Sequence, residues 1–128
     1  EDRRRILADA LALGAEYVDI ESRARFDDLL EHSGGRRVVL SYHDFKGMPA
    51  DLAGLVQAMR STGAEVVKVA VKIERLSDCV PLLDLGAQAG RQTGFVVIGM
   101  GPFGLATRGP GAKVSRLCPT RRQGSPRN

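Results

Sequence analysis

A lysine stands alone within an apolar run that has the composition of a β-strand. The run spans residues 65–71, and Lys68 is its only basic residue. Because side chains alternate between the two faces of a strand, Lys68 shares its face with Val66 and Ala70. With little water around it the charged ammonium is disfavoured, and the uncharged amine is the form that attacks a carbonyl to give an imine. The alternative is a structural lysine whose stem packs while its ammonium reaches solvent.

A histidine directly follows the preceding predicted strand. The β-branched run from Val38 leads into His43, and Gly47 and Pro49 mark the loop beyond it. Reactive groups of parallel α/β proteins collect at the carboxyl ends of strands, and histidine is well suited to proton transfer near neutral pH. On its own His43 is typical of a structural histidine. Beside Lys68 it is a candidate general acid and base.

Four apolar runs predict the parallel sheet that positions these two residues. We expect the strands at residues 17–21, 37–42, 66–71 and 95–100. Their apolar character on both faces is typical of a sheet covered by helices. The predicted fold class is therefore α/β, either a small open domain or part of a (β/α)₈ barrel, since a complete barrel needs about 250 residues.

Helical periodicity separates the predicted strands. One helix is predicted from Leu52, Leu55, Val56 and Met59. The next is predicted from Leu76, Val80, Leu83 and Ala87, with Ser77 as its N-cap and Pro81 in its first turn. A leading helix is predicted from Ile6, Ala10 and Leu13, with its end at Gly14. His32 lies beside Ser33, Gly34 and Gly35 and is read as a surface residue near a helix end.

Charge divides the chain into two parts. Residues 1–107 carry 13 Lys or Arg against 15 Asp or Glu, whereas residues 108–128 carry six basic residues and no acidic one, so the net charge of +4 arises from the tail. We expect a folded domain over residues 1–108 and an irregular basic tail over residues 109–128. Such a tail could bind phosphates, but no aromatic residue is interleaved for base stacking, so nucleic acid is not favoured as a partner.

Other patterns exclude several classes of site. Cys79 and Cys118 have no metal-ligand spacing, so neither a zinc site nor a disulfide framework is indicated, and a reduced cytoplasmic setting fits best. No apolar stretch is long enough to span a bilayer, so no membrane partner is expected. The glycines from Gly99 to Gly104 match a dinucleotide fingerprint in form, but no acidic residue follows Asp84 to hold a ribose.

These glycines are instead read as a tight loop at a strand end, with Arg108 just beyond. An arginine there is suited to bidentate binding of a substrate carboxylate. A surface arginine at the start of the basic tail is the alternative.

Four segments together resemble type I 3-dehydroquinate dehydratase, and residues 17–21 look like the strand that precedes the histidine strand of that family. The segments are residues 41–45 (SYHDF), residues 67–70 (VKVA), Met100, and residues 104–108 (GLATR). The resemblance implies a (β/α)₈ barrel and the third step of the shikimate pathway, which leads to the aromatic amino acids. It implies His43 as general acid and base, Lys68 as the imine-forming residue and Arg108 as the carboxylate ligand. The implied substrate is the small molecule 3-dehydroquinate, and neither a metal nor another cofactor is needed.

The departures from the family pattern are also specific. The resemblance places the start of this sequence in the helix before the fourth strand, so the segments with a Glu-x-Arg contact, a further arginine and a glutamate that assists the histidine are expected to be missing. Ser125 is near the position of a substrate-contacting serine, but Pro126 makes equivalence doubtful. We therefore expect an impaired lyase whose open sheet edges favour association with another copy or with the missing half.

Two alternatives to this reading stay open. One is another imine-forming barrel lyase of the class I aldolase type. The other is a non-catalytic fragment with a basic, nucleic-acid-binding tail.

Overall fold

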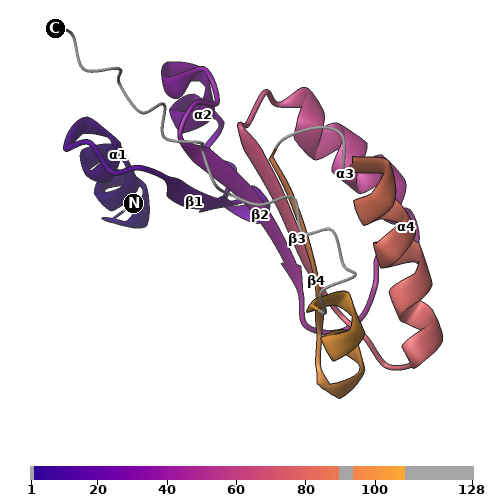
Figure 1. Cartoon of the computed structure of the whole chain (residues 1–128). Coiled ribbons are helices and arrows are strands. Elements are labelled where there is room, and N and C mark those ends of the chain that lie inside the picture. The colour runs from indigo at the N-terminus through magenta and orange to yellow at the C-terminus, as the bar shows by residue number, and fades with distance from the viewer. Residues whose placement is uncertain (1, 90–93, 109–128) are drawn as a thin grey trace, which may run out of the picture.

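The computed structural model describes residues 2–89 and 94–108 (Figure 1). Helices and parallel strands alternate along this part of the chain. In order, the elements are α1 (Asp2–Ala12), β1 (Val18–Glu21), the 3₁₀ helix η1 (Ser22–Ala24), α2 (Asp27–Ser33), β2 (Val38–Asp44), α3 (Leu52–Ser61), β3 (Val66–Lys72), the 3₁₀ helix η2 (Leu76–Asp78), α4 (Cys79–Ala89), β4 (Phe95–Met100) and the 3₁₀ helix η3 (Pro102–Arg108).

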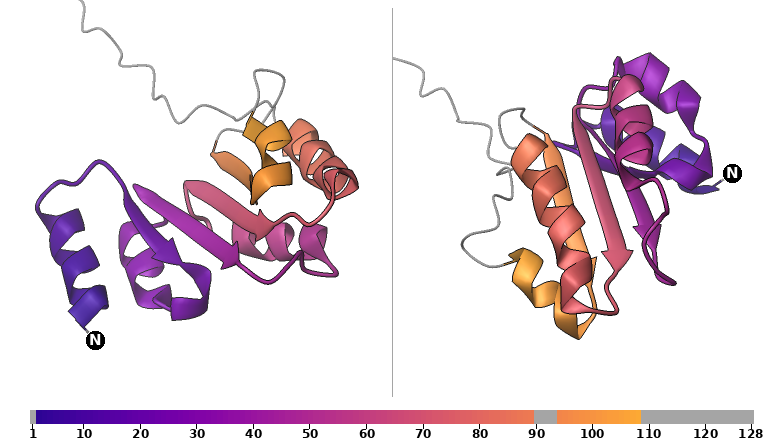
Figure 2. Two further views of the ribbon diagram at one scale, coloured as in Figure 1. Left: turned by 90° about the horizontal axis from the view of Figure 1, so that it is seen from below. Right: turned by 90° about the vertical axis from the view of Figure 1, so that its right-hand side faces the viewer.

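The four predicted strands form one parallel sheet in the order β1-β2-β3-β4. The observed strands differ from the predicted ones by at most two residues at either end. Figure 2 shows that the sheet curves and that α2 and α3 lie on its outer side. The prediction of an α/β arrangement with flanking helices is therefore confirmed.

Alternation along the strands divides the core into two unequal clusters. The outer face contributes residues such as Val38, Leu40 and Val69, which pack with buried residues of α2, α3 and α4. The inner face carries a smaller apolar cluster of Val39, Val66 and Val96, joined by the half-buried Tyr17 and Ile98. Lys68 and His43 also lie on this inner face, because they alternate with the outer residues of their strands.

The buried face of α4 differs from the predicted one. Leu76, Val80 and Leu83 are exposed, and the buried residues are Cys79, Leu82, Gly86 and Ala89. The buried residues Cys79, Leu82 and Gly86 each lie one position before a residue predicted to be buried. The helix is therefore rotated about its axis by about 100° from the predicted orientation. Small residues explain the choice: a Cβ on Gly86 would lie 3.4 Å from Val97 Cγ1, so α4 approaches β4 closely at this point.

The predicted cap of this helix is also wrong. Ser77 lies inside η2, and the side chain of Asp78 accepts hydrogen bonds from the backbone N–H groups of Glu74 and Arg75. Pro81 does fall in the first turn of α4, as predicted.

Truncating Leu82 tests the observed orientation of α4. Leu82 is fully buried, so Leu82→Ala is expected to lower the free energy of unfolding by about 2 to 5 kcal/mol through lost burial and a residual cavity. The matched control is Leu83→Ala on the same helix, which is expected to cost less than about 1 kcal/mol because Leu83 is 39% exposed. Urea unfolding of both variants measures the difference. Equal losses, or a larger loss for Leu83, would contradict this packing.

The leading helix packs through Ala10, as predicted, but not through Ile6 or Leu13. Ile6 and Leu13 are exposed, whereas Leu7, Ala10 and Leu11 pack against the core. The predicted end at Gly14 is close to the observed end at Ala12, and Gly14 has a φ of 91°. A positive φ of this kind favours glycine.

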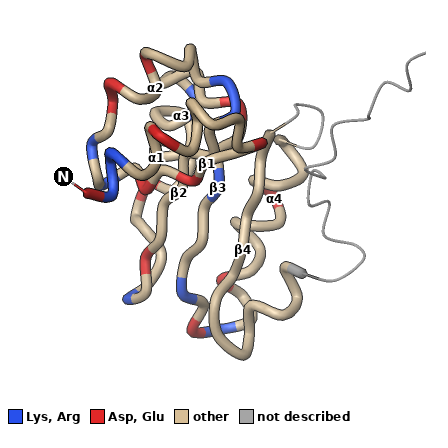
Figure 3. Tube along the Cα trace, turned by 90° about the vertical axis from the view of Figure 1, so that its left-hand side faces the viewer, with Lys and Arg blue, Asp and Glu red and all other residues tan. Residues whose placement is uncertain are grey.

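Charged residues are spread over α1 to β3, and β4 carries none (Figure 3).

One charged residue, Glu65, connects the amino ends of three strands. Its carboxylate accepts from the backbone N–H of Arg37 and from the Tyr17 hydroxyl, both at 2.7 Å. These two hydrogen bonds hold the pKa of Glu65 below its ordinary value, and the bond from the Arg37 N–H has the larger effect. The same carboxylate raises the pKa of the Tyr17 hydroxyl.

This network predicts a pH-dependent contribution to stability. Because the pKa of Glu65 is lowered by folding, its contribution is present above the ordinary value of 4.5 and is lost as the pH falls through the folded-state value. Glu65→Gln is therefore expected to lower the urea midpoint at pH 7, and the difference from the native chain should shrink below about pH 4.5. Glu31→Gln, on the exposed surface of α2, is the control. A constant difference across this range would contradict the role of the carboxylate.

The loop after β4 is a tight turn, as predicted. Gly101 has a φ of 92°, and a Cβ on Gly104 would overlap the Gly99 carbonyl. The buried Thr107 hydroxyl accepts from the Gly99 N–H at 2.9 Å and donates to the Gly104 carbonyl at 2.6 Å. These contacts fold η3 back onto the end of β4.

Candidate active site

The carboxyl end of β2 brings His43 next to a glutamate of β1. His43 Nδ1 and Glu21 Oε2 are 2.7 Å apart, and both side chains are about three-quarters buried. An ionised carboxylate accepts the Nδ1 proton, so it selects the Nδ1–H tautomer and leaves Nε2 to exchange a proton with a substrate. The histidine thus has an acidic partner, Glu21, which the sequence analysis did not assign to it.

Lys68 forms a second acidic pair on the same face of the sheet. Its Nζ lies 3.1 Å from Asp19 Oδ2, and the Ser41 hydroxyl donates to the other oxygen of that carboxylate. Asp19 therefore reaches across β2 to the lysine of β3. The Lys68 side chain is 27% exposed, so it is buried to about the same extent as His43, and a carboxylate that the sequence analysis did not identify compensates its charge.

Register explains why the two pairs are neighbours. Ser41 is aligned with Lys68, and His43 is aligned with Ala70, two residues further along β3. Side chains two residues apart share a face, so His43 and Lys68 project from adjacent strands on the inner face, His43 near the carboxyl end of β2 and Lys68 at the third position of β3. A basic amine and an imidazole side by side can form an imine with a carbonyl compound and move a proton at the neighbouring carbon.

A separate group of side chains holds the loop that follows His43. Asp44 Oδ1 accepts from the N–H groups of Lys46 at 2.9 Å and Gly47 at 3.3 Å. Both bonds lower the pKa of Asp44, and the bond from Lys46 has the larger effect. Arg23 of η1 donates to the Tyr42 hydroxyl at 2.8 Å and lies 3.7 Å from Asp44.

Phe45 lies against the histidine from this loop. The two rings are nearly parallel, at an interplanar angle of 9° with centroids 6.1 Å apart. Phe45 remains 73% exposed, so this side of the imidazole borders an apolar surface that is open to a ligand.

The third predicted site residue, Arg108, is placed only by its backbone, at the end of η3. Its side chain lies outside the described part of the chain, as do Cys118, Ser125 and the whole segment of residues 109–128. The predicted division at residue 108 and the predicted character of the tail therefore stay predictions.

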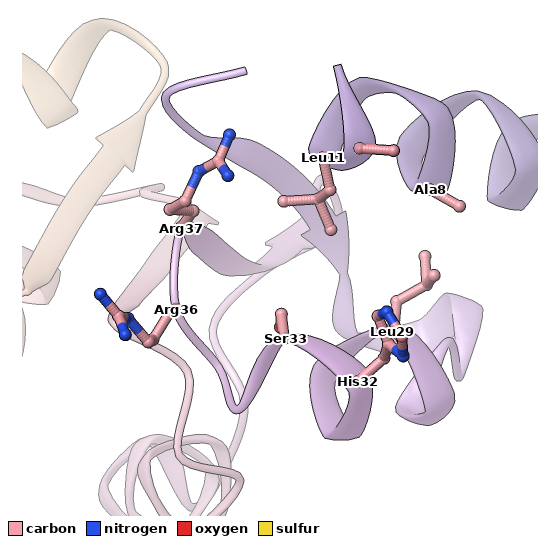
Figure 4. A pocket seen from close by; sticks show the side chains of 8 residues that line it. Ala8, Leu11, Leu29, His32, Ser33, Arg36 and Arg37 are labelled. Carbon is pink, nitrogen blue, oxygen red and sulfur yellow. The ribbon is translucent and has the colours of Figure 1, made fainter. Parts of the chain in front are cut away.

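A cavity of about 440 Å³ lies between α1 and α2, at the opposite end of the sheet (Figure 4). It is lined by Ala8, Leu11, Ala12, Leu29, His32, Ser33, Arg36 and Arg37. The guanidinium of Arg37 donates to the Ala15 carbonyl, with Nε at 2.8 Å, and so supports the turn between α1 and β1. His32 lies in the last turn of α2, as predicted, and lines this cavity.

Asp19 and Glu21 are the site residues that sequence reasoning missed. A signal was present, because two carboxylates at i and i+2 end a predicted strand and therefore share one face. Nothing in the spacing, however, connected them with partners that are 22 and 49 residues further along the chain.

Comparison with known proteins agrees with this arrangement. A family model described as type I 3-dehydroquinase matches residues 1–120. The chain belongs to the type I 3-dehydroquinase family. Its relatives include the 3-dehydroquinate dehydratase of Syntrophobacter fumaroxidans, which is 36% identical over 118 residues, a match that covers 84% of this chain and 48% of the relative. The bifunctional chloroplastic 3-dehydroquinate dehydratase/shikimate dehydrogenase of Arabidopsis thaliana is 30% identical over 113 residues, covering 84% of this chain and 18% of that protein.

Solved structures of 3-dehydroquinate dehydratases have the same fold over the part that this chain matches. The 3-dehydroquinate dehydratase of Geobacillus kaustophilus superimposes with a TM-score of 0.73 at 26% identity, over 89% of this chain and 48% of that one. These neighbours are barrels, so the predicted fold class, part of a (β/α)₈ barrel with four parallel strands, is confirmed. The chain spans about half the length of the single-function dehydratases that it matches.

No group of three or more His, Cys, Asp or Glu side chains in residues 2–89 and 94–108 could hold a metal ion. Within the same ranges, no helix has the length and apolar character needed to cross a membrane.

Proposed function

We propose that this chain carries the imine-forming and proton-transferring residues of a 3-dehydroquinate dehydratase, acting on 3-dehydroquinate as its small-molecule substrate. The observation that supports this most is the placement of His43 and Lys68 on one face of adjacent strands, with His43 near the carboxyl end of β2, in a member of the type I 3-dehydroquinase family. The reaction expected is the loss of water from 3-dehydroquinate to give 3-dehydroshikimate.

The proposed chemistry begins at Lys68. Its neutral amine adds to the C3 ketone, and loss of water from the adduct gives an iminium that acidifies the adjacent C2 proton. Asp19, 3.1 Å from the lysine nitrogen, is placed to take up the proton that the ammonium must first release. Formation of the iminium releases one water, and hydrolysis of the product imine later consumes one.

His43 performs the proton transfers of the elimination. Nε2 removes the C2 proton, the electron pair is accepted by the iminium, and the resulting enamine expels the C1 hydroxyl as His43 returns the proton to it. Glu21 holds the ring through Nδ1 and stabilises the imidazolium between these steps. Hydrolysis of the product imine then releases 3-dehydroshikimate and regenerates the amine of Lys68.

Substrate binding is expected to involve Arg108 as a bidentate partner of the carboxylate. We expect the 128-residue chain by itself to turn over slowly, because positioning contributes several kcal/mol to catalysis and most groups that would orient the ring are not among its residues. A cytoplasmic setting and association with another copy of the chain remain part of this proposal.

Reductive trapping tests the role of Lys68 without requiring fast turnover. The chain is incubated with 3-dehydroshikimate and borohydride, digested, and analysed by mass spectrometry. A stable secondary amine is expected on Lys68. An adduct confined to Lys46 or Lys72, or no adduct at saturating product, would contradict the proposal.

A further inference from the structure

The backbone pairing between β1 and β2 stops short of the catalytic histidine. The ladder ends where Glu21 is aligned with Ser41, whereas β2 continues through His43 to Asp44 alongside β3 only. Hydrogen bonds between the two strands therefore hold Glu21 but do not extend to the level of His43. Side chains beyond the ladder make the further connections between the end of β1 and the end of β2.

One cluster of side chains makes this connection, and it consists of Arg23, Tyr42 and Asp44. The Arg23 guanidinium carbon lies 4.6 Å from the centre of the Tyr42 ring, and Arg23 Nη2 donates to the Tyr42 hydroxyl at 2.8 Å. That hydroxyl in turn donates to Asp44 Oδ2 at 3.2 Å, and Arg23 also forms an ion pair with Asp44 at 3.7 Å. Three of these contacts join Arg23, two residues after Glu21, to the two residues that flank His43, and the fourth joins those two residues to each other.

The cluster and the histidine lie on opposite faces of β2. Tyr42 and Asp44 alternate with His43 along the strand, so the cluster contacts β2 on its outer face, whereas Glu21 binds the imidazole on the inner face. Asp44 also fixes the loop carrying Phe45, through the N–H groups of Lys46 and Gly47.

We propose that Arg23 is a positioning residue for His43: with Tyr42 and Asp44 it holds the end of β1 so that Glu21 keeps the imidazole in the Nδ1–H tautomer. The inference rests on the proposed function for the importance of that tautomer, since only then does Nε2 accept the substrate proton. The geometric part can be tested with no substrate.

Nitrogen NMR of the ¹⁵N-histidine-labelled chain measures the tautomers directly. The sequence has two histidines, so His32 on α2 serves as an internal reference in every spectrum. At alkaline pH, where both rings are neutral, His43 should be mainly the Nδ1–H form. Arg23→Gln is expected to lower its ratio of Nδ1–H to Nε2–H tautomers about fivefold, the loss expected for one exposed cation–π contact and one charge-assisted hydrogen bond. The spectrum of His32 should not change.

Matched variants separate positioning from general charge effects. Arg25→Gln removes a cation from the same segment, but Arg25 pairs with Asp27 and is expected to leave His43 unchanged. Tyr42→Phe removes the shared hydroxyl and should shift His43 in the same direction as Arg23→Gln, and the two changes combined should add little. Arg23 is largely exposed, so this variant is expected to fold, which circular dichroism checks.

Several outcomes would overturn the inference. They are an unchanged His43 tautomer ratio in Arg23→Gln, an equal shift in Arg25→Gln, or an unchanged ratio in Glu21→Ala, which would show that the Glu21 bond does not select the tautomer. Each is independent of imine trapping on Lys68, so failure of the positioning inference and failure of the proposed function are distinguishable.

Discussion

Replacing Lys68 with methionine is expected to abolish the borohydride-trapped adduct and to reduce formation of the 3-dehydroshikimate enone to the level of buffer. Methionine keeps the length and the apolar stem of lysine but has no nitrogen, so no iminium can form and the C2 proton is not acidified. Peptide mass spectrometry reads the adduct, and ultraviolet absorbance reads the enone. Lys68→Met is also expected to lower the stability of the chain, because the Asp19 carboxylate, 3.1 Å from the lysine nitrogen, loses that partner.

Lys72→Met is the matched control for this experiment. Lys72 lies on the same strand and the same face as Lys68, but it pairs with Glu74 at the end of β3. This variant should retain the adduct on Lys68. Persistence of the adduct in Lys68→Met, or its loss in Lys72→Met, would contradict the assignment of the imine to Lys68.

Replacing His43 with glutamine is expected to separate imine formation from elimination. Loss of a general acid and base typically costs about 10²- to 10⁴-fold in rate. Trapping during reaction with 3-dehydroquinate should therefore yield, on Lys68, an adduct that still contains the C1 hydroxyl. The native chain should yield an adduct lighter by one water. The two masses distinguish the roles of His43 and Lys68 in a single experiment.

His32→Gln is the corresponding control, because His32 is the other histidine of the sequence and lies on α2 at the opposite end of the sheet. It should give the same adduct mass as the native chain. If His43→Gln also gave the dehydrated adduct at the native rate, another group would have to transfer the proton, and Glu21 would be the first to test.

Much of the fold was predictable because it depends on local patterns. Apolar runs of β-branched residues predicted all four strands, and alternation within residues 65–71 placed Lys68 on the face opposite to the three valines that join the outer core. Gly101 and Gly104 predicted the tight turn after β4, since backbone at positive φ and close backbone approach both favour glycine.

Helix orientation was not predictable in the same way. On α4 two sets of residues have helical spacing, one containing Leu82 and one containing Leu83, and both are apolar enough to be buried. Packing decided between them, because Gly86 allows close approach to Val97. Periodicity defines a helix, but it selects a face only when the other faces are polar.

The sequence by itself determined that an amine within one strand and an imidazole at the end of the preceding strand lie on neighbouring parallel strands, because strand alternation and strand ends are local properties of the chain. Only the tertiary structure decided what those groups contact. The register between strands aligned Ser41 with Lys68, brought Asp19 across β2 to the lysine, and set Glu21 against His43 where the ladder of β1 stops. Contacts between residues that are separated by 22 or 49 positions depend on that register and on the curvature of the sheet. Neither the register nor the curvature can be read from spacing along the chain.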